Sequence, residues 1–391
     1  MRIGVTGAFG FLGANLVSSL IARESLIGEI VAFSSRKSRN PLFDPALTTV
    51  VPLDVLDGED VQRKTRGLDA LFHFAGKVSF ARRERRATWD VNVLGARNVF
   101  EAALENRIFR VVYVSSINVL GACSADRLIA DESNDVYAPE ARNPNSFHSS
   151  RQALAAVDSS AAGNYSFLEK VRVAYFDSKL ASLELARRYH RERGLPVVIV
   201  MPGTAVGPGD IHYDISELIE RVFTNRLAAT FPGASSFVHS KDFAEGASLA
   251  WQKGRTGESY IISGRDEDNL SYRDFMRLAA GVARDQGRKV REDFVVMPRW
   301  LSLTAARLLE AAAPGSKLGS TLGTALILSG SMVHRFSSAK ARGELGYAPR
   351  RTLEQSIADC YEFLCAAREE GVIGRPRQGT ERSPQTARFY H

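Results

Sequence analysis

Three glycines near the start of the chain constrain its fold more than any other feature. They lie in the segment Thr6-Gly-Ala-Phe-Gly-Phe-Leu-Gly13, which follows a short apolar run and precedes a helical pattern. Gly7 permits a tight turn, Gly10 lets a pyrophosphate approach the backbone, and Gly13 lets the helix pack closely on the strand. The start of the helix adds free N–H groups and a positive dipole end. This order predicts a dinucleotide site, with a glycine turn that binds nothing as the alternative.

Short apolar segments recur along the chain, with helical segments between them. Strands are expected at 2–5, 30–33, 50–53, 70–74, 111–114 and 197–200, and helices at about 14–23 and 89–106. Such alternation indicates parallel β-α-β units. We therefore predict an α/β fold with a Rossmann-type doubly wound parallel sheet and a smaller, mainly helical C-terminal substrate lobe.

The expected domain division follows this pattern. We assign residues 1–208 and 238–265 to the dinucleotide-binding domain, and residues 209–237 and 266–373 to the substrate-binding lobe. Residues 374–391 are polar, contain proline and lack periodicity, so we expect a disordered basic tail there.

Composition limits the classes of function. The 391 residues carry a net charge of +7, spread over several clusters without a nucleic-acid-binding module. We expect no nucleic acid partner, and we interpret the charge as a solvated surface that attracts anionic ligands. The three cysteines form no Cys-x-x-Cys pair, which fits a reduced, cytoplasmic compartment, and no metal site is predicted. The first strand begins at once, so no signal peptide is expected, and no apolar run reaches the roughly 18 residues of a membrane span.

The end of the second strand bears on the choice between NAD and NADP. An acidic residue there would bind the ribose 2′-hydroxyl of NAD, but the sequence reads Phe33-Ser34-Ser35-Arg36-Lys37. Two hydroxyls and two cations suit a 2′-phosphate, so we favour NADP(H) and keep NAD(H) as the alternative. Arg36 and Lys37 otherwise begin a solvated loop. Asp54, after the third strand, is expected either to accept from the adenine amine or to cap the next helix.

Tyr175 and Lys179 form the second chemical motif, Tyr-Phe-Asp-Ser-Lys. Their spacing places both side chains on one face of a helix. A phenol has a pKa of about 10, and a nearby ammonium favours the phenolate. The pair is therefore a candidate general acid or base, and Lys179 can also reach the ribose hydroxyls of a cofactor. Ser115 and Ser116 follow the fifth strand at the ligand-binding edge, where we choose Ser116 to orient a carbonyl, with a capping role as the alternative.

Taken together, these residues resemble the extended short-chain dehydrogenase/reductase family over about residues 1–370. The quoted similarity also includes Phe72-His-Phe-Ala-Gly76, Asn92-Val-x-Gly95, Val112-Tyr-Val-Ser-Ser116, Met201-Pro-Gly-Thr-Ala-Val-Gly207, Phe237-Val-His239 and Phe336-Ser-Ser-Ala-Lys340. The late stretch is similar to dihydroflavonol-reductase-like, 3β-hydroxysteroid-dehydrogenase-like and hopanoid-associated members.

The resemblance implies roles for particular residues. It implies a Ser116–Tyr175–Lys179 triad supported by Asn92, with Ala75–Lys77 along the cofactor, Pro202–Val206 near the nicotinamide carboxamide, and His73 as a structural residue. The predicted cofactor contacts are Gly7, Phe9, Gly10, Phe11, Leu12, Gly13, Ser34, Ser35, Arg36, Lys37, Asp54, Val55, Phe74, Ala75, Gly76, Lys77, Ser115, Tyr175, Lys179, Pro202, Gly203, Thr204 and Val206.

Two features depart from the family pattern. Ser116 and Tyr175 are 59 positions apart, and the excess falls at about 139–170, where an insertion with a short helix near 151–157 is expected to form a substrate lid. Met201 replaces the arginine that often precedes Pro202. This replacement makes a sugar-nucleotide a weaker candidate for the substrate.

We therefore expect an NADPH-dependent reductase of a ketone or aldehyde, or the reverse dehydrogenase, acting on a mainly apolar small molecule. The alternatives are a nucleotide-sugar epimerase or dehydratase and a non-catalytic cofactor-sensing scaffold. A homodimer is compatible with the sequence.

The apolar segments near 300–312 and 324–328 are expected to cover the substrate pocket and bury each other. The alternative for them is a partly exposed surface that docks on a membrane.

Overall fold

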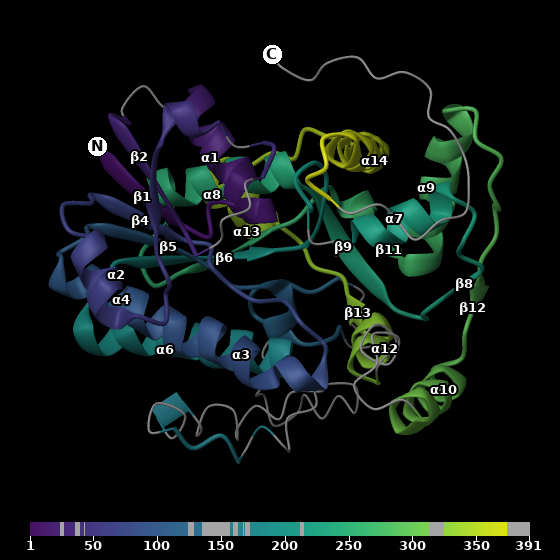
Figure 1. Cartoon of the computed structure of the whole chain (residues 1–391), viewed down its shortest axis with the longest axis horizontal. Coiled ribbons are helices and arrows are strands. Elements are labelled where there is room, and N and C mark those ends of the chain that lie inside the picture. The colour runs from purple at the N-terminus through teal and green to yellow at the C-terminus, as the bar shows by residue number, and fades with distance from the viewer. Residues whose placement is uncertain are drawn as a thin grey trace.

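The predicted parallel sheet is present in the computed structural model. This structure describes residues 1–23, 27–35, 40–42, 44–123, 129–134, 157–158, 163–166, 168, 173–211, 215–312 and 324–373. Seven strands lie in the order β10-β6-β5-β4-β1-β2-β3 (Figure 1). They are β1 (Arg2–Thr6), β2 (Glu29–Ser34), β3 (Thr49–Pro52), β4 (Ala70–His73), β5 (Arg110–Val114), β6 (Val197–Pro202) and β10 (Ser259–Ile262). All neighbours pair in parallel, so their carboxyl ends share the edge where such sheets bind ligands.

Helices cover both faces of this sheet (Figure 1). One face carries α1 (Phe11–Arg23), α8 (Ser240–Lys253) and α13 (Ala339–Leu345). The other carries α2 (Gly58–Lys64), α3 (Arg85–Trp89), α4 (Gly95–Glu105) and α6 (Ala174–Arg193). Each face therefore has its own apolar core, and β6 is buried at every residue. Burial on both faces explains why its sequence is a continuous apolar run rather than an alternating one.

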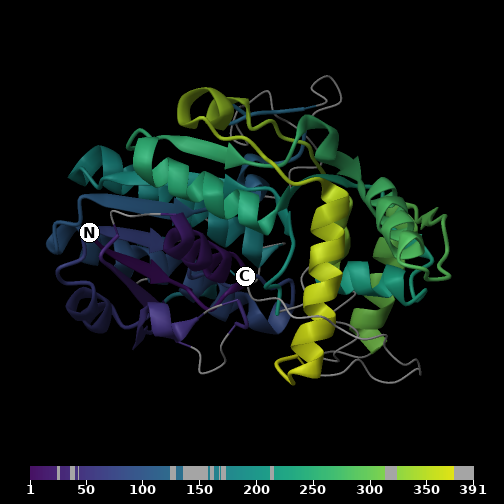
Figure 2. The same ribbon diagram turned by 90° about the horizontal axis from the view of Figure 1, so that it is seen from above.

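A second, smaller sheet organises the C-terminal lobe. Its central strand is β9 (Ala234–His239), which pairs with β7 (Thr204–Val206), β11 (Asn269–Ser271) and β13 (Val333–His334). The lobe also contains α7 (Ser216–Phe223), β8 (Ala229–Thr230), α9 (Tyr272–Asp285), β12 (Val295–Val296), α10 (Arg299–Ala312), α12 (Thr324–Gly330) and α14 (Leu353–Glu369). Helices α7, α9 and α14 share one apolar core. In Figure 2 the long yellow helix α14 lies between the seven-stranded sheet and α9.

The six predicted strands are confirmed to within two residues at each end. The helix expected at 89–106 differs in detail, because the helical segment begins at Arg85 and is interrupted by a π-helical turn at Asp90–Leu94. The seventh strand and the short strands of the lobe were not predicted. The tail at 374–391 and most of the insertion at 139–170 lie outside the described residues.

The described residues form neither a helix that could span a membrane nor a cluster of metal ligands. Among the helices in the described ranges, none has both the length and the apolar character that crossing a membrane requires. Within the same ranges, no three His, Cys, Asp or Glu side chains come together as metal ligands would.

Candidate active site

The glycine turn joins β1 to α1 and packs against the segment that follows β4. Gly7 has a φ of +68°, and a Cβ added to it would lie 2.7 Å from the backbone nitrogen of Ala75. A Cβ on Gly13 would overlap the carbonyl oxygen of Gly7. The turn is closed by Gly10, whose N–H donates to Gly7 O at 2.9 Å. Side chains are thus excluded at Gly7 and Gly13, as the predicted phosphate-binding turn requires.

Thr6 and His73 connect the carboxyl ends of β1 and β4 beneath this turn. Thr6 Oγ1 lies 2.8 Å from His73 Nδ1 and accepts from the backbone N–H of Ala75 at 3.2 Å. Burial, together with the smaller effect of the Lys179 charge, lowers the pKa of His73 to about 3. The imidazole is therefore neutral at ordinary pH, and it holds two strands together rather than carrying a charge.

Tyr175 and Lys179 lie in the first turns of α6, both largely buried. Lys179 Nζ donates to the carbonyl oxygen of Val114 at 2.9 Å, at the end of β5. The same ammonium is 5.7 Å from the ring centre of Tyr113. Burial lowers the pKa of Lys179 to about 8. The lysine is therefore fixed against the sheet edge directly before the two serines.

The two serines that follow β5 differ in their bonding. Ser116 caps a short 3₁₀ turn, and its Oγ accepts from the N–H of Asn118 at 3.2 Å. Its own hydroxyl hydrogen remains to donate elsewhere. Ser115 Oγ is buried and has no hydrogen-bond partner among the described residues. A buried hydroxyl without a partner costs free energy, so the site fits a bound group that supplies one.

Asn92 occupies the π-helical turn and reaches across to the segment after β4. Its Oδ1 accepts from the N–H of Lys77 at 2.8 Å, and its Nδ2 donates to the carbonyl oxygen of Lys77 at 3.0 Å. Nδ2 also donates to Ser178 Oγ at 2.9 Å, and that hydroxyl donates to the carbonyl oxygen of Tyr175. Asn92 therefore joins the cofactor-side segment to the turn that carries Tyr175.

Gly76 shows how close these parts lie. A Cβ added to it would be 3.3 Å from Asn92 Oδ1 and 3.4 Å from Lys179 Nζ. Ala75, the residue before it, meets the turn at Gly7. Ala75 thus lies against the glycine turn, and Gly76 lies close to Lys179.

An apolar cluster surrounds Tyr175. Phe80 approaches the tyrosine ring edge-on at 6.1 Å between centres, and it approaches Phe176 in the same way at 6.2 Å. The rest of the cluster comprises Val173, Leu328 and Met332, with Ala122, Leu303 and Ala325 packed against it. Helices α10 and α12 therefore contribute side chains to the environment of Tyr175. Phe80 was not predicted from the sequence, because a single aromatic residue in an irregular segment carries no pattern.

The remaining predicted cofactor residues follow the carboxyl edge of the sheet. At Gly203 the chain leaves β6 for the small sheet, and Thr204 Oγ1 lies 2.6 Å from Ser235 Oγ. Ser34 is buried at the end of β2, and Ser35 is exposed. Asp54 accepts from the N–H of Leu56 at 3.0 Å within a turn. It does not cap the next helix, because the N-cap of α2 is Asp57. Arg36 and Lys37 lie outside the described residues.

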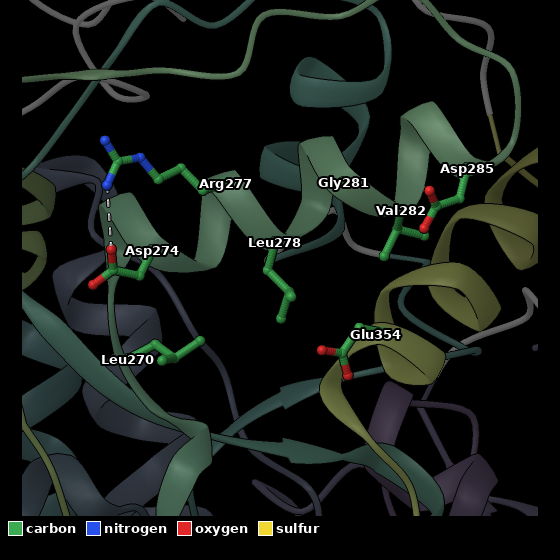
Figure 3. Close-up of a pocket in the computed structure, with 8 residues that line it drawn as sticks. All are labelled: Leu270, Asp274, Arg277, Leu278, Gly281, Val282, Asp285 and Glu354. Carbon is green, nitrogen blue, oxygen red and sulfur yellow. Dashed lines mark ion pairs between the residues drawn. The ribbon is translucent and has the colours of Figure 1, made fainter.

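A surface pocket elsewhere on the molecule involves none of these residues. It lies along α9 and the start of α14 (Figure 3). Its lining consists of Leu270, Asp274, Arg277, Leu278, Gly281, Val282, Asp285 and Glu354. Arg277 and Asp274 form an ion pair there at 3.8 Å. This pocket does not change the assignment of the candidate site.

Comparison with known proteins agrees with this geometry. The profile of the NAD dependent epimerase/dehydratase family matches residues 3–263. Sterol demethylase protein B of Methylococcus capsulatus is 30% identical over 262 residues, which cover 66% of this chain and 69% of that protein. A ketoreductase of Stigmatella aurantiaca, named for a farnesyl dihydroquinoline-1-oxide, is 28% identical, with 96% and 98% coverage. The crystal structure of gox2253 has a TM-score of 0.71 and 26% identity, covering 95% of this chain and 99% of that one.

Proposed function

This chain belongs to the NAD dependent epimerase/dehydratase family and is an NAD(P)-dependent oxidoreductase of the extended short-chain dehydrogenase/reductase type; from that premise we propose that it reduces a ketone or aldehyde with NADPH, or runs the reverse reaction. The observation that carries the proposal is the double contact of Ala75 and Gly76. Ala75 lies against Gly7 of the glycine turn, and Gly76, the next residue, lies close to the ammonium of Lys179. A hydride source and a proton source are thus expected side by side.

The proposed chemistry divides between cofactor and protein. A dinucleotide held at the glycine turn Gly7–Gly13 would supply or accept the hydride. Tyr175 then protonates the carbonyl oxygen, Ser116 donates a hydrogen bond to that oxygen, and the positive charge of Lys179 favours proton release from the phenol. Asn92 holds the turn of Tyr175 through Ser178 and so keeps the phenol at its place. Tyr175, Lys179 and Ser116 are the proposed catalytic residues, with Asn92 as a positioning residue.

The environment of Tyr175 supports a mainly apolar substrate. The tyrosine belongs to an apolar cluster with Phe80, Phe176, Leu328 and Met332. Burying an apolar surface of this kind is favourable by about 25 cal/mol per Å². The names of the two relatives point in the same direction, since one refers to a sterol and the other to a farnesylated ketone. A panel of ketones and aldehydes, followed by NADPH absorbance, tests the proposal. Turnover of nucleotide sugars alone would contradict it.

We propose NADP(H) as the preferred cofactor on the basis of the Ser34-Ser-Arg-Lys37 sequence, with NAD(H) as the alternative that the family description favours. Arg36→Ala should weaken NADPH binding at least about tenfold and leave NADH binding nearly unchanged. A charge-assisted hydrogen bond contributes about 1.5–3 kcal/mol, and only NADPH carries the 2′-phosphate. Isothermal titration with both cofactors measures the effect. Arg63→Ala, an exposed arginine on α2, is the matched control. Equal weakening of both cofactors would remove Arg36 from the phosphate site.

The insertion at 139–170 is proposed as part of a substrate lid, because it joins the Ser116 strand to the Tyr175 helix. Shortening it should change KM or the range of substrates while the far-UV circular dichroism and the unfolding temperature stay close to those of the full chain. Long irregular segments in compact domains usually bind something or stay solvated. Kinetics measured with several substrates decide between these two roles. Unchanged KM values throughout would favour a solvated or oligomer-contact segment.

The epimerase or dehydratase alternative keeps the same residues and differs in the fate of the hydride. The family description includes both reactions. An epimerase returns the hydride to its own substrate and is expected to retain the cofactor through purification, whereas a reductase exchanges it at every turnover. Absorbance of the purified protein after cofactor extraction separates the two. The presence of Ser116, Tyr175 and Lys179 together in the sequence argues against a non-catalytic cofactor-sensing scaffold.

The described structure contains Cys123, Cys360 and Cys365 as free thiols, which fits the proposed cytoplasmic location. We also propose the division into a dinucleotide-binding domain (1–208 and 238–265) and a substrate lobe (209–237 and 266–373), which the presence of two separate sheets supports. Two elements cross the proposed boundaries, because β7 pairs with β9 in the small sheet and α13 packs on the seven-stranded sheet. A homodimer is also proposed, for which gel filtration with light scattering is the direct test.

A further inference from the structure

Tyr113, near the end of β5, lies beneath the ammonium of Lys179. Nζ of the lysine is placed over the tyrosine ring, 5.7 Å from its centre. An aromatic face attracts a cation within about 6 Å, and the attraction is stronger where water is excluded. Both side chains are buried here. No role for Tyr113 was predicted from the sequence, because the residue lies inside an apolar strand.

The Tyr113 ring is fixed by contacts on its other sides. Its hydroxyl lies 2.6 Å from Ser182 Oγ. That serine donates its own hydrogen to the carbonyl oxygen of Ser178 at 2.9 Å, so the tyrosine is the donor between the two hydroxyls. His73 stacks on the ring at 5.8 Å between centres, and Phe100 meets it edge-on at 5.4 Å. The ring therefore keeps one orientation relative to the lysine.

The ammonium of Lys179 has few other groups that favour its charge. It carries three N–H donors, and among the described residues its hydrogen-bond acceptor is the carbonyl oxygen of Val114. In the same part of the chain Lys179 forms no ion pair. The nearby charge of Lys77, on the segment after β4, is itself paired with Glu84 at 3.2 Å. A buried cation with one acceptor gains from a neighbouring aromatic face.

The titratable groups around Lys179 do not compete with the ring. His73, from β4, is neutral at ordinary pH because its pKa is about 3. Burial raises the pKa of Tyr113, so the phenol on β5 is neutral as well. Tyr175, one turn earlier on α6, is the phenol on which the lysine charge is proposed to act. The Tyr113 ring is thus the feature of this surrounding that favours the charged form of Lys179 without a charge of its own.

We propose that Tyr113 is a positioning residue of the candidate active site, and that the face of its ring supports the ammonium of Lys179 at the end of β5. The ring attracts the cation without accepting a hydrogen bond, so the other N–H donors of the lysine stay available to a cofactor ribose. The inference rests on the proposed function, since it takes Lys179 as a catalytic residue. It adds a part of the site that the Tyr-x-x-x-Lys spacing does not contain.

Phenylalanines with increasing numbers of fluorine atoms, introduced at position 113, test the proposal. Fluorine withdraws electrons from the ring face and changes its size little, so the fold should persist while the attraction for a cation falls. Tyr113→Phe is the reference, because it lacks the same hydroxyl. A weaker ring lowers the pKa of Lys179 in the folded protein. The pH above which the free energy of unfolding starts to rise should therefore fall by about half a unit between phenylalanine and pentafluorophenylalanine. Urea unfolding at a series of pH values measures this shift without turnover.

Turnover with NADPH supplies a second readout. It should fall about two- to fivefold along the same series, as the lysine charge becomes less well supported. Pentafluorophenylalanine at position 100 is the matched control. Phe100 packs on the Tyr113 ring and forms no cation–π contact with Lys179 in the described structure. Its replacement should leave the pH at which stability starts to rise where the wild type has it.

The two readouts separate this inference from the proposed function. If Lys179→Met abolishes turnover but neither readout changes along the fluorinated series, the role of Tyr113 is wrong and the proposed function stands. If Lys179→Met keeps turnover near wild type while the pH of the rise still shifts, the contact between ring and ammonium stands and the proposed function falls. A shift of equal size from fluorination at position 100 would also overturn the proposal, because the effect would not be specific to the ring beneath Lys179.

Discussion

Tyr175→Phe is expected to remove nearly all turnover while leaving cofactor binding within a few-fold of wild type. The substitution deletes one hydroxyl, and general acid catalysis contributes about 10²–10⁴-fold to rate. Its carbonyl oxygen still accepts from Ser178, and a phenylalanine ring still packs on Phe80, so the helix turn should keep its position. Stopped-flow or steady-state NADPH oxidation gives the rate, and titration of NADPH fluorescence gives the affinity.

Tyr189→Phe is the matched control for this experiment. It lies on the same helix, and its hydroxyl donates to Glu101 Oε1 at the far end from the candidate site. Turnover of that variant should stay close to wild type. If Tyr175→Phe retained activity within a few-fold of wild type, the assignment of the proton donor would be wrong.

Lys179→Met is expected to raise stability and to lower activity. Burial brings the pKa of Lys179 from 10.5 to about 8, so the folded protein bears the cost of a poorly hydrated ammonium at pH 7. That difference corresponds to at most about 3 kcal/mol of unfolding free energy. The gain is reduced because Val114 O loses its donor. Turnover should fall about 100-fold or more, since the phenol loses its cationic neighbour.

The pH dependence gives this prediction its sharpest test. Between about pH 8 and pH 10.5 the unfolded chain binds the proton of Lys179 and the folded protein does not, so this group makes stability rise with pH across that window. Below pH 8 both states are protonated and the cost is constant. Urea unfolding of the cofactor-free protein measures this effect. The amount by which Lys179→Met exceeds the wild type in free energy of unfolding should be smaller at pH 10 than at pH 7. Lys241→Met, an exposed lysine, should show no such change. If the difference in unfolding free energy were the same at both pH values, the stabilisation would not come from removing the buried Lys179 charge.

The main sheet was predictable chiefly because its central strands are continuous apolar runs. β5 and β6 carry consecutive buried valine and isoleucine residues, which have no other favourable environment in a chain of this size. β12 and β13 have only two residues each. Segments of that length contain too few side chains for a periodicity, so tertiary pairing alone defines them.

The site was predictable where spacing along one element determines it. Tyr175 and Lys179 are one helical turn apart, and the glycine turn is local in sequence. The contacts that connect these motifs are not local. Asn92 meets Ser178 across 86 positions, and Phe80 meets Tyr175 from an irregular segment. The π-helical turn that aims Asn92 has no sequence signature in this chain, because the same residues are compatible with a regular helix.

The way Asn92 holds Lys77 has an evolutionary consequence. Both hydrogen bonds go to the main chain of residue 77, so they survive any side chain there that tolerates the backbone conformation. The segment between the two residues forms a closed arc that is tied at its base and carries Phe80 toward Tyr175. Substitutions at residues 78–84 can therefore change which side chains surround the Tyr175 phenol. Tyr175, the proposed proton donor, keeps its position. Selection for a new substrate should accumulate changes inside this arc and leave Asn92 untouched.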